Sequence, residues 1–119
     1  MKKLERSAEI ISSKRVCEEF RLIYELQGAQ KAINFLARYY KIRRMKIIVD
    51  GRRVGNSDEA SYDYETYTAY FKKKGLNRFN VLHEFYHHLT NIKDWELSER
   101  REEREADRYA DKFLRILNS

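Results

Sequence analysis

The pattern His83-Glu84-Phe85-Tyr86-His87 constrains the fold more than any other feature of the sequence. Two histidines four residues apart lie on one face of an α-helix, one turn from each other, so both imidazoles can bind one metal ion if the segment is helical. In such a helix Glu84 directly follows the first histidine, where its carboxylate can reach a metal-bound water. The spacing therefore predicts a helix with a catalytic zinc site, in which His83 and His87 are ligands and Glu84 is the catalytic residue.

A catalytic zinc ion requires a third protein ligand and one open coordination position. The remaining histidine, His88, lies about 100° from His87 around the helix and points away from the expected site. Cys17 is far upstream, in a segment with helical periodicity. A helix expected near the C-terminus offers carboxylates instead. These are Glu99, Glu102, Glu103 and Glu105.

Helical periodicity distinguishes between these carboxylates. Glu103 shares the expected inward face with Ala106 and Ala110, whose small side chains allow two helices to approach closely. Glu102 lies at the edge of this face, and Glu105 lies roughly 200° from Glu103 around the helix. We therefore predict one zinc ion per chain, held by the two histidines and Glu103, with Glu102 and then Glu105 as alternatives.

Asp107 is one helical turn beyond Glu103. A carboxylate in this position can accept a hydrogen bond from the unliganded nitrogen of a zinc-bound histidine, which fixes the tautomer and the orientation of the ring. The alternative is a solvated helical carboxylate paired with Arg104 or Arg108. The sequence leaves both interpretations open.

The remainder of the chain indicates a single α+β domain over residues 1–119. Apolar residues near a 3.6-residue period predict N-terminal helices with a break at Gly28, and residues 46–50, 61–62 and 67–71 have the composition of strands. Asn77 or Asn80 is expected to cap the histidine helix, and Ser98 the last helix. The expected order is a helical part, a small twisted antiparallel or mixed sheet, the H-E-x-x-H helix and a glutamate-bearing helix, over residues 1–44, 45–74, 77–90 and 98–117.

The charge and the single cysteine restrict the setting of the protein. A net charge of +6 suits acidic partners such as nucleic acid, but the lysines and arginines occur in scattered pairs and triplets, for which solubility is the simpler explanation. Cys17 is the only cysteine, so no intramolecular disulfide can form and a cytoplasmic location is expected. Charged residues throughout 4–15 argue against a signal peptide, and no apolar run is long enough to span a membrane.

Two segments carry a resemblance to a known family. Residues 81–89 and 103–110 together resemble the gluzincin signature, H-E-x-x-H followed by E-x-x-x-D-x-x-A. They are similar to soluble ImmA/IrrE-type metallopeptidases and to minigluzincins, which are compact relatives of the catalytic domains of membrane metallopeptidases. Residues 61–70 resemble the hairpin that these domains place before the zinc helix. The resemblance covers roughly residues 45–117.

The resemblance implies zinc-dependent hydrolysis of peptide bonds, with Glu84 as general base. It also implies that the strand from Thr66 to Phe71 is the outer strand of the sheet and binds an extended peptide substrate by strand addition. Tyr70, Tyr86 and Tyr109 are conceivable donors to the oxyanion. Latency is known in minigluzincins; the tail after the last helix is short, so exchange of that helix between two subunits is the expected route to it.

Two other classes of function stay open. One is a non-catalytic module with a zincin-like fold that binds a protein partner. The other is a regulator associated with DNA, which the basic charge and the ImmA/IrrE resemblance suggest.

Overall fold

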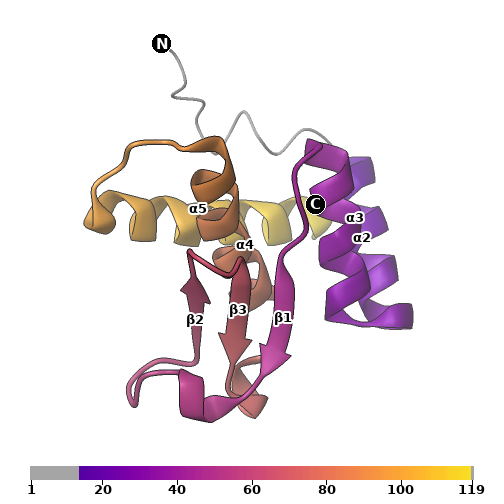
Figure 1. Cartoon of the computed structure of the whole chain (residues 1–119). Coiled ribbons are helices and arrows are strands. Elements are labelled where there is room, and N and C mark those ends of the chain that lie inside the picture. The colour runs from indigo at the N-terminus through magenta and orange to yellow at the C-terminus, as the bar shows by residue number, and fades with distance from the viewer. Residues whose placement is uncertain (1–13, 119) are drawn as a thin grey trace.

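The computed structural model describes residues 14–118, which fold as the α+β class expected from the sequence (Figure 1). Four α-helices, three short strands and two 3-10 turns follow one another along this part of the chain. The helices are α2 (Lys14–Gln27), α3 (Ala29–Tyr40), α4 (Arg78–Lys93) and α5 (Glu99–Leu117). The strands are β1 (Lys46–Val49), β2 (Ala60–Asp63) and β3 (Thr68–Phe71), and the 3-10 turns are η1 (Gly51–Arg53) and η2 (Lys73–Gly75).

The three strands form a mixed sheet in the order β1-β3-β2. β2 and β3 are the two arms of an antiparallel hairpin, with Tyr62 opposite Ala69. β1 pairs with the other edge of β3 in the parallel direction, with Ile47 opposite Ala69. Ala69 and Phe71 are fully buried, so this face of the sheet packs into the core.

The expectation that the strand from Thr66 to Phe71 is the outer strand is wrong. β3 lies in the centre of the sheet and bonds to a neighbour along both edges. The strand begins only at Thr68, because Tyr67 takes a left-handed backbone conformation with φ of 58° that ends the turn before it. Within residues 14–118, β2 has no strand on its second edge, so the free edge of the hairpin belongs to β2.

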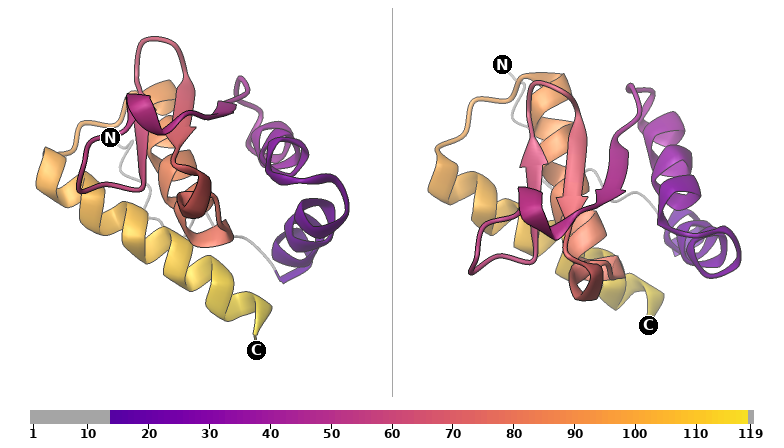
Figure 2. Two further views of the ribbon diagram at one scale, coloured as in Figure 1. Left: turned by 90° about the horizontal axis from the view of Figure 1, so that it is seen from below. Right: turned by 60° about the horizontal axis from the view of Figure 1, so that its bottom comes forward.

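The N-terminal helices α2 and α3 lie on the β1 side of the molecule, away from β2 (Figure 2). Gly28, with φ of 96°, separates α2 from α3 at the predicted break. The ring of Phe20 in α2 meets the ring of Phe113 in α5 edge-on, 5.2 Å between centroids. From α3, the ring of Tyr40 stacks on Phe85 of α4, and its hydroxyl lies 3.0 Å from the hydroxyl of Tyr109 in α5. Tyr40 therefore contacts both α4 and α5 and helps to fix these two helices relative to each other.

The first turns of α4 and α5 are capped as the sequence predicts. The side chain of Asn77 accepts a hydrogen bond from the backbone N–H of Asn80 at the start of α4. Ser98 accepts one from the backbone N–H of Arg101 at the start of α5. Each cap satisfies an N–H group that has no partner within the helix and sets where the helix begins.

None of the helices within residues 14–118 combines the length and the apolar character needed to cross a membrane.

The packing of α2 generates a prediction about Cys17. Its side chain is 1% exposed, and burial, with a smaller effect of the Glu18 charge, raises the pKa of the thiol to about 11. We expect iodoacetamide to alkylate the native protein at pH 8 at least about 100-fold more slowly than a free cysteine, because the thiolate is the reactive form. Mass spectrometry of timed samples measures this rate. Unfolding in guanidinium should restore the rate of a free thiol; fast labelling of the native protein would show that α2 is not docked.

Candidate metal centre

Three side chains from two helices converge at one point. His83 and His87 project from successive turns of α4, and their Nε2 atoms are 3.2 Å apart. Glu103 reaches them from α5, with Oε1 3.1 Å from Nε2 of His83 and Oε2 2.9 Å from Nε2 of His87. One ligand atom from each of the three residues lies within 4.8 Å of the others, so the group can hold a metal ion.

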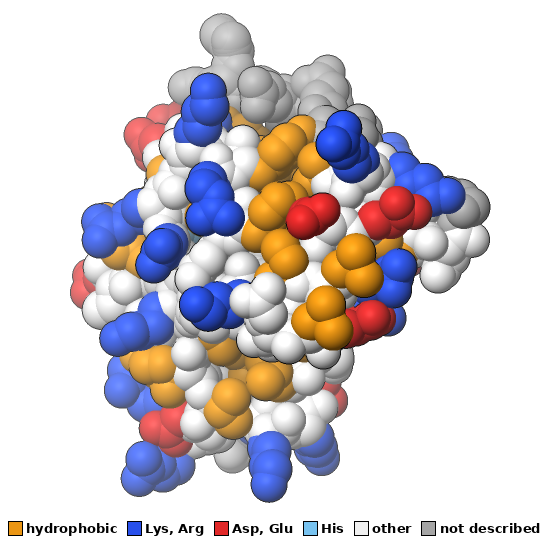
Figure 3. Space-filling view, turned by 90° about the vertical axis from the view of Figure 1, so that its right-hand side faces the viewer, with side chains coloured by type: hydrophobic (Ala, Val, Ile, Leu, Met, Phe, Trp, Pro, Cys, Tyr) orange, Lys and Arg blue, Asp and Glu red, His pale blue; other side chains and the backbone are white. Residues whose placement is uncertain are grey.

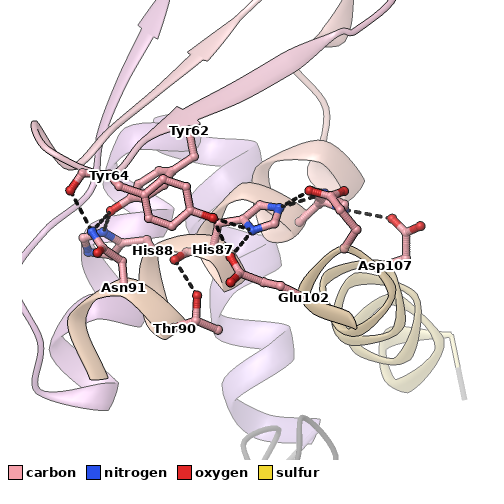
Figure 4. A network of polar contacts seen from close by, with 10 residues as sticks. Tyr62, Tyr64, His87, His88, Thr90, Asn91, Glu102 and Asp107 are labelled. Carbon is pink, nitrogen blue, oxygen red and sulfur yellow. Dashed lines mark hydrogen bonds and ion pairs between the residues drawn. The ribbon is translucent and has the colours of Figure 1, made fainter. Parts of the chain in front are cut away.

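The second ring nitrogen of each histidine is bound to a carboxylate of α5. Nδ1 of His83 lies 2.8 Å from Oδ1 of Asp107. Nδ1 of His87 lies 2.5 Å from Oε2 of Glu102, as Figure 4 shows for these two side chains. Because a carboxylate only accepts, each Nδ1 carries a hydrogen, which leaves Nε2 as the nitrogen that would offer its lone pair to a bound metal ion. Asp107 thus makes the contact with His83 that the orienting interpretation requires, while it stays exposed to solvent.

The donor set fits a metal ion such as zinc. Two imidazole lone pairs and a carboxylate facing one another repel unless a cation or a proton lies between them. Two nitrogens bound tetrahedrally to zinc at ordinary bond lengths would be about 3.3 Å apart, close to the separation of the two Nε2 atoms in this structure. The arrangement therefore has both the chemistry and the spacing of a metal site.

Glu102 has a different role from the one the sequence indicated. The sequence offers it as the alternative to Glu103 for the third ligand, but its carboxylate contacts Nδ1 of His87 and accepts a hydrogen bond from the hydroxyl of Tyr64 at 2.5 Å. Burial favours protonation of Glu102, but these two hydrogen bonds outweigh it and lower its pKa. Burial also lowers the pKa of His87, while the Glu102 hydrogen bond and the charges of Glu84 and Glu103 more than reverse this effect and raise it.

Tyr64 is a site residue that the sequence analysis missed. It lies in the turn between β2 and β3, where a tyrosine gives no pattern that could indicate its partners. Glu105, the remaining alternative ligand, points away from the site and lies 3.5 Å from Arg108 and 3.9 Å from Arg101.

His88 faces away from the metal centre, as predicted, and joins α4 to the sheet. Its Nε2 donates to the backbone carbonyl of Arg43 at 2.7 Å, and its Nδ1 accepts from the hydroxyl of Tyr62 at 2.7 Å. The amide of Asn91 donates to the same hydroxyl and to the carbonyl of Tyr64 (Figure 4). Burial lowers the pKa of His88, which suits a neutral ring with one donor and one acceptor.

Glu84 is a buried carboxylate without a partner. Its side chain lines the cleft described below and is only 6% exposed, yet no hydrogen bond or ion pair satisfies it within the described residues. Burial is the largest influence on its pKa and raises it to about 7; the charge of His87 opposes this, and Glu103 and Asp58 add to it. A carboxylate held in this state can exchange a proton near neutral pH.

The metal-binding group opens into a cleft of about 790 Å³. The free edge of β2 forms one wall, α5 forms the other, and α4 lies at the bottom with both histidines and Glu84. The conceivable oxyanion donors lie elsewhere: Tyr86 and Tyr109 are buried in the core, and Tyr70 lies under the guanidinium of Arg53. The tyrosines that line the cleft are Tyr62 and Tyr64.

The geometry predicts how metal affinity responds to single substitutions. We expect one divalent ion per chain, with affinity reduced about 10–100-fold by Glu102→Gln or Asp107→Asn, which remove orienting acceptors, and further by Glu103→Ala, which removes a ligand. Glu105→Gln changes the same type of residue outside the site and should have no effect. Competition with a chromogenic zinc chelator measures these affinities. Unchanged affinity in Glu103→Ala would contradict the assigned ligand.

No protein-family model, no curated protein and no solved structure matches the chain. The gluzincin resemblance therefore stays a prediction, and the candidate metal centre rests on the geometry of its own residues.

Proposed function

We propose that this protein is a zinc-dependent metallopeptidase, with His83, His87 and Glu103 as the zinc ligands and Glu84 as the general base. The observation that carries the proposal is the state of Glu84. A carboxylate that is buried, unpaired and directed into a cleft beside a metal-binding group lacks a structural purpose, because its burial destabilises the fold. The position is the one a base needs to reach a metal-bound water.

In the proposed reaction, a bound zinc ion supplies the Lewis acid that polarises the peptide carbonyl and acidifies a water molecule. Glu84 accepts the proton of that water and then delivers it to the leaving amine. Asp107 and Glu102 keep the histidine rings in the tautomer that binds metal, and Tyr64 holds Glu102 in place.

We propose that a peptide substrate pairs with β2 and not with the strand from Thr66 to Phe71, which the resemblance implies. Along a strand of an antiparallel pair, successive residues point their backbone N–H and C=O groups alternately toward and away from the partner strand. The hydrogen bond from the Lys72 N–H to the Glu59 carbonyl shows that Glu59 points toward the partner. The backbone groups of Ala60 and Tyr62 consequently point away from β3, and both residues line the cleft. An extended peptide can pair with this edge and bring a carbonyl to the metal centre.

The substitution Glu84→Gln tests the proposal. It keeps the size of the side chain but removes the base, so cleavage should fall about 10²–10⁴-fold while zinc binding persists. Cleavage is measured by mass spectrometry on a peptide library, and zinc content by elemental analysis. Glu105→Gln, matched in chemistry and outside the cleft, should cleave like the parent protein.

The proposed peptidase activity would be contradicted by either of two results. One is a metal-loaded parent protein that cleaves no peptide, and the other is a Glu84→Gln variant that cleaves at the parent rate. With zinc bound in both cases, the first result would support the non-catalytic module instead.

A basic surface favours a second candidate function, the binding of nucleic acid. Five cations occur between positions 38 and 46, at the end of α3 and the start of β1, and no acidic residue lies among them. All are exposed, and none forms an ion pair within the described residues. They are Arg38, Lys41, Arg43, Arg44 and Lys46. Figure 3 shows one face of the molecule, on which lysine and arginine side chains are densest toward the left and also occur at the upper right and the lower edge.

Salt dependence tests this second candidate. Binding of a fluorescent DNA duplex, followed by anisotropy, should weaken steeply with salt, because each phosphate that a cation neutralises releases counterions. Replacing Arg43, Arg44 and Lys46 with glutamine should reduce the slope of log affinity against log salt by about 0.9 for each phosphate that is no longer neutralised.

The matched control replaces Arg100, Arg104 and Lys112 of α5, which removes the same charge from another surface. Equal reductions of the slope in the two variants, or no binding at low salt, would exclude a specific nucleic-acid surface.

A further inference from the structure

The charge of the cleft is opposite to the charge of the chain. Within residues 14–118, seven acidic side chains and no lysine or arginine line the cleft. The whole sequence has 25 Lys and Arg against 19 Asp and Glu. Four of the seven acids belong to the metal centre or are the proposed base. The other three, Asp58, Glu59 and Glu99, belong to the walls of the cleft and have no role in the proposed chemistry.

The three carboxylates of the cleft wall form no ion pair with a cation of residues 14–118. Asp58, Glu59 and Glu99 are exposed, and none forms an ion pair within the described residues. Glu59 accepts a hydrogen bond from the side-chain amide of Asn80 at 3.0 Å, which holds it in position but leaves its charge. A zinc ion would offset only two of the negative charges in the cleft, so these three stay available to a ligand.

These carboxylates stand at opposite ends of the path along β2. Asp58 and Glu59 directly precede β2, beside the first turn of α4. Glu99 is the first residue of α5, three positions before Glu102, which contacts His87. A peptide paired with β2 would therefore run from one acidic end of the cleft, across the metal ligands, to the other.

We propose that the cleft selects peptide segments with lysine or arginine on both sides of the metal centre, held at one end by Asp58 and Glu59 and at the other by Glu99. This inference rests on the proposed function, since it names the substrate class of the same cleft. β2 supplies the main-chain pairing, which is indifferent to sequence, and the carboxylates of the cleft wall supply the specificity.

The overall charge of the protein predicts the opposite preference. A net charge of +6 attracts acidic peptides and repels basic ones, but salt largely screens this effect beyond ~8–10 Å at physiological ionic strength. Within the cleft the local carboxylates dominate. Exposed ion pairs between two lysines of a peptide and the carboxylates at the two ends of the cleft together give a preference of roughly tenfold over an uncharged peptide.

The test is equilibrium binding of fluorescent peptides to the zinc-loaded Glu84→Gln variant, in which the peptide is not consumed. One peptide of about eight residues has a lysine near each end; a second has acetyl-lysine at these positions, with similar length and no charge; a third has glutamate. At about 50 mM salt, the lysine peptide should have a Kd roughly tenfold below that of the acetyl-lysine peptide. At about 0.5 M salt the difference should shrink, because the charges are screened.

Two variants in this background locate the effect. The first carries Asp58→Asn, Glu59→Gln and Glu99→Gln, and it should bind the lysine and acetyl-lysine peptides alike. The control variant removes three acids that do not line the cleft, through Glu19→Gln, Glu25→Gln and Asp111→Asn, and it should keep the preference. All six positions are on the surface, and circular dichroism verifies that both variants fold.

The outcomes separate this inference from the peptidase itself. A lysine preference that disappears only in the cleft variant supports the inference, even if the parent protein cleaves nothing. Equal binding of the three peptides, tighter binding of the glutamate peptide, a preference that survives in the cleft variant, or no peptide binding overturns it, even if the parent protein is an active peptidase.

Discussion

The contact between α4 and α5 is the interaction on which the rest of the structure depends. Ala106 and Ala110 are fully buried in this contact, and side chains as small as alanine allow the two backbones to approach closely. The aromatic rings of Tyr86 and Tyr109 pack together beside them, 5.5 Å between centroids. The separation of the helices decides whether Glu103 reaches the two histidines. A larger side chain at Ala106 would therefore move a metal ligand as well as disturb the core.

Much of this arrangement could be predicted from the sequence, because it depends on local periodicity. The i, i+4 spacing placed His83 and His87 on one face, and the small residues on the last helix identified the face that carries Glu103. Caps at Asn77 and Ser98 follow from the ability of their side chains to accept hydrogen bonds from backbone N–H groups. Each of these features involves residues within one or two helical turns of each other.

What could not be predicted depends on contacts between distant segments. The position of β3 in the centre of the sheet results from a parallel pairing with β1, which lies across a long connection and has no local signal. The roles of Glu102 and Tyr64 could not be assigned because they depend on the hairpin turn meeting the first turn of α5 across 38 residues. The isolation of Glu84 is a property of its whole surroundings, which no spacing of residues records.

The polar residues around the site fall into two groups, one whose hydrogen bonds are satisfied and one that is left unsatisfied. Tyr62, His88 and Asn91 satisfy one another with donors and acceptors in place, so this part of the interior is fixed by hydrogen bonds. Glu84, on the same helix, is left with a polar group that no protein atom satisfies within the described residues. Proteins tolerate such a cost mainly where a ligand or reaction requires it. In α4, His88 and Asn91 therefore anchor the helix to the sheet, whereas Glu84 faces the cleft.

Within residues 14–118, α5 alone supplies the acidic residues that contact the ring nitrogens of the two histidines in the candidate metal centre. Glu102, Glu103 and Asp107 all belong to the first half of α5, so the centre exists only while that helix is docked on α4. During synthesis the histidines leave the ribosome about 20 residues before Asp107 does, and at ordinary elongation rates this interval lasts about 1–4 s. Throughout that interval the nascent chain has no complete site. For the proposed peptidase, such an order of assembly would delay activity until α5 has docked on α4.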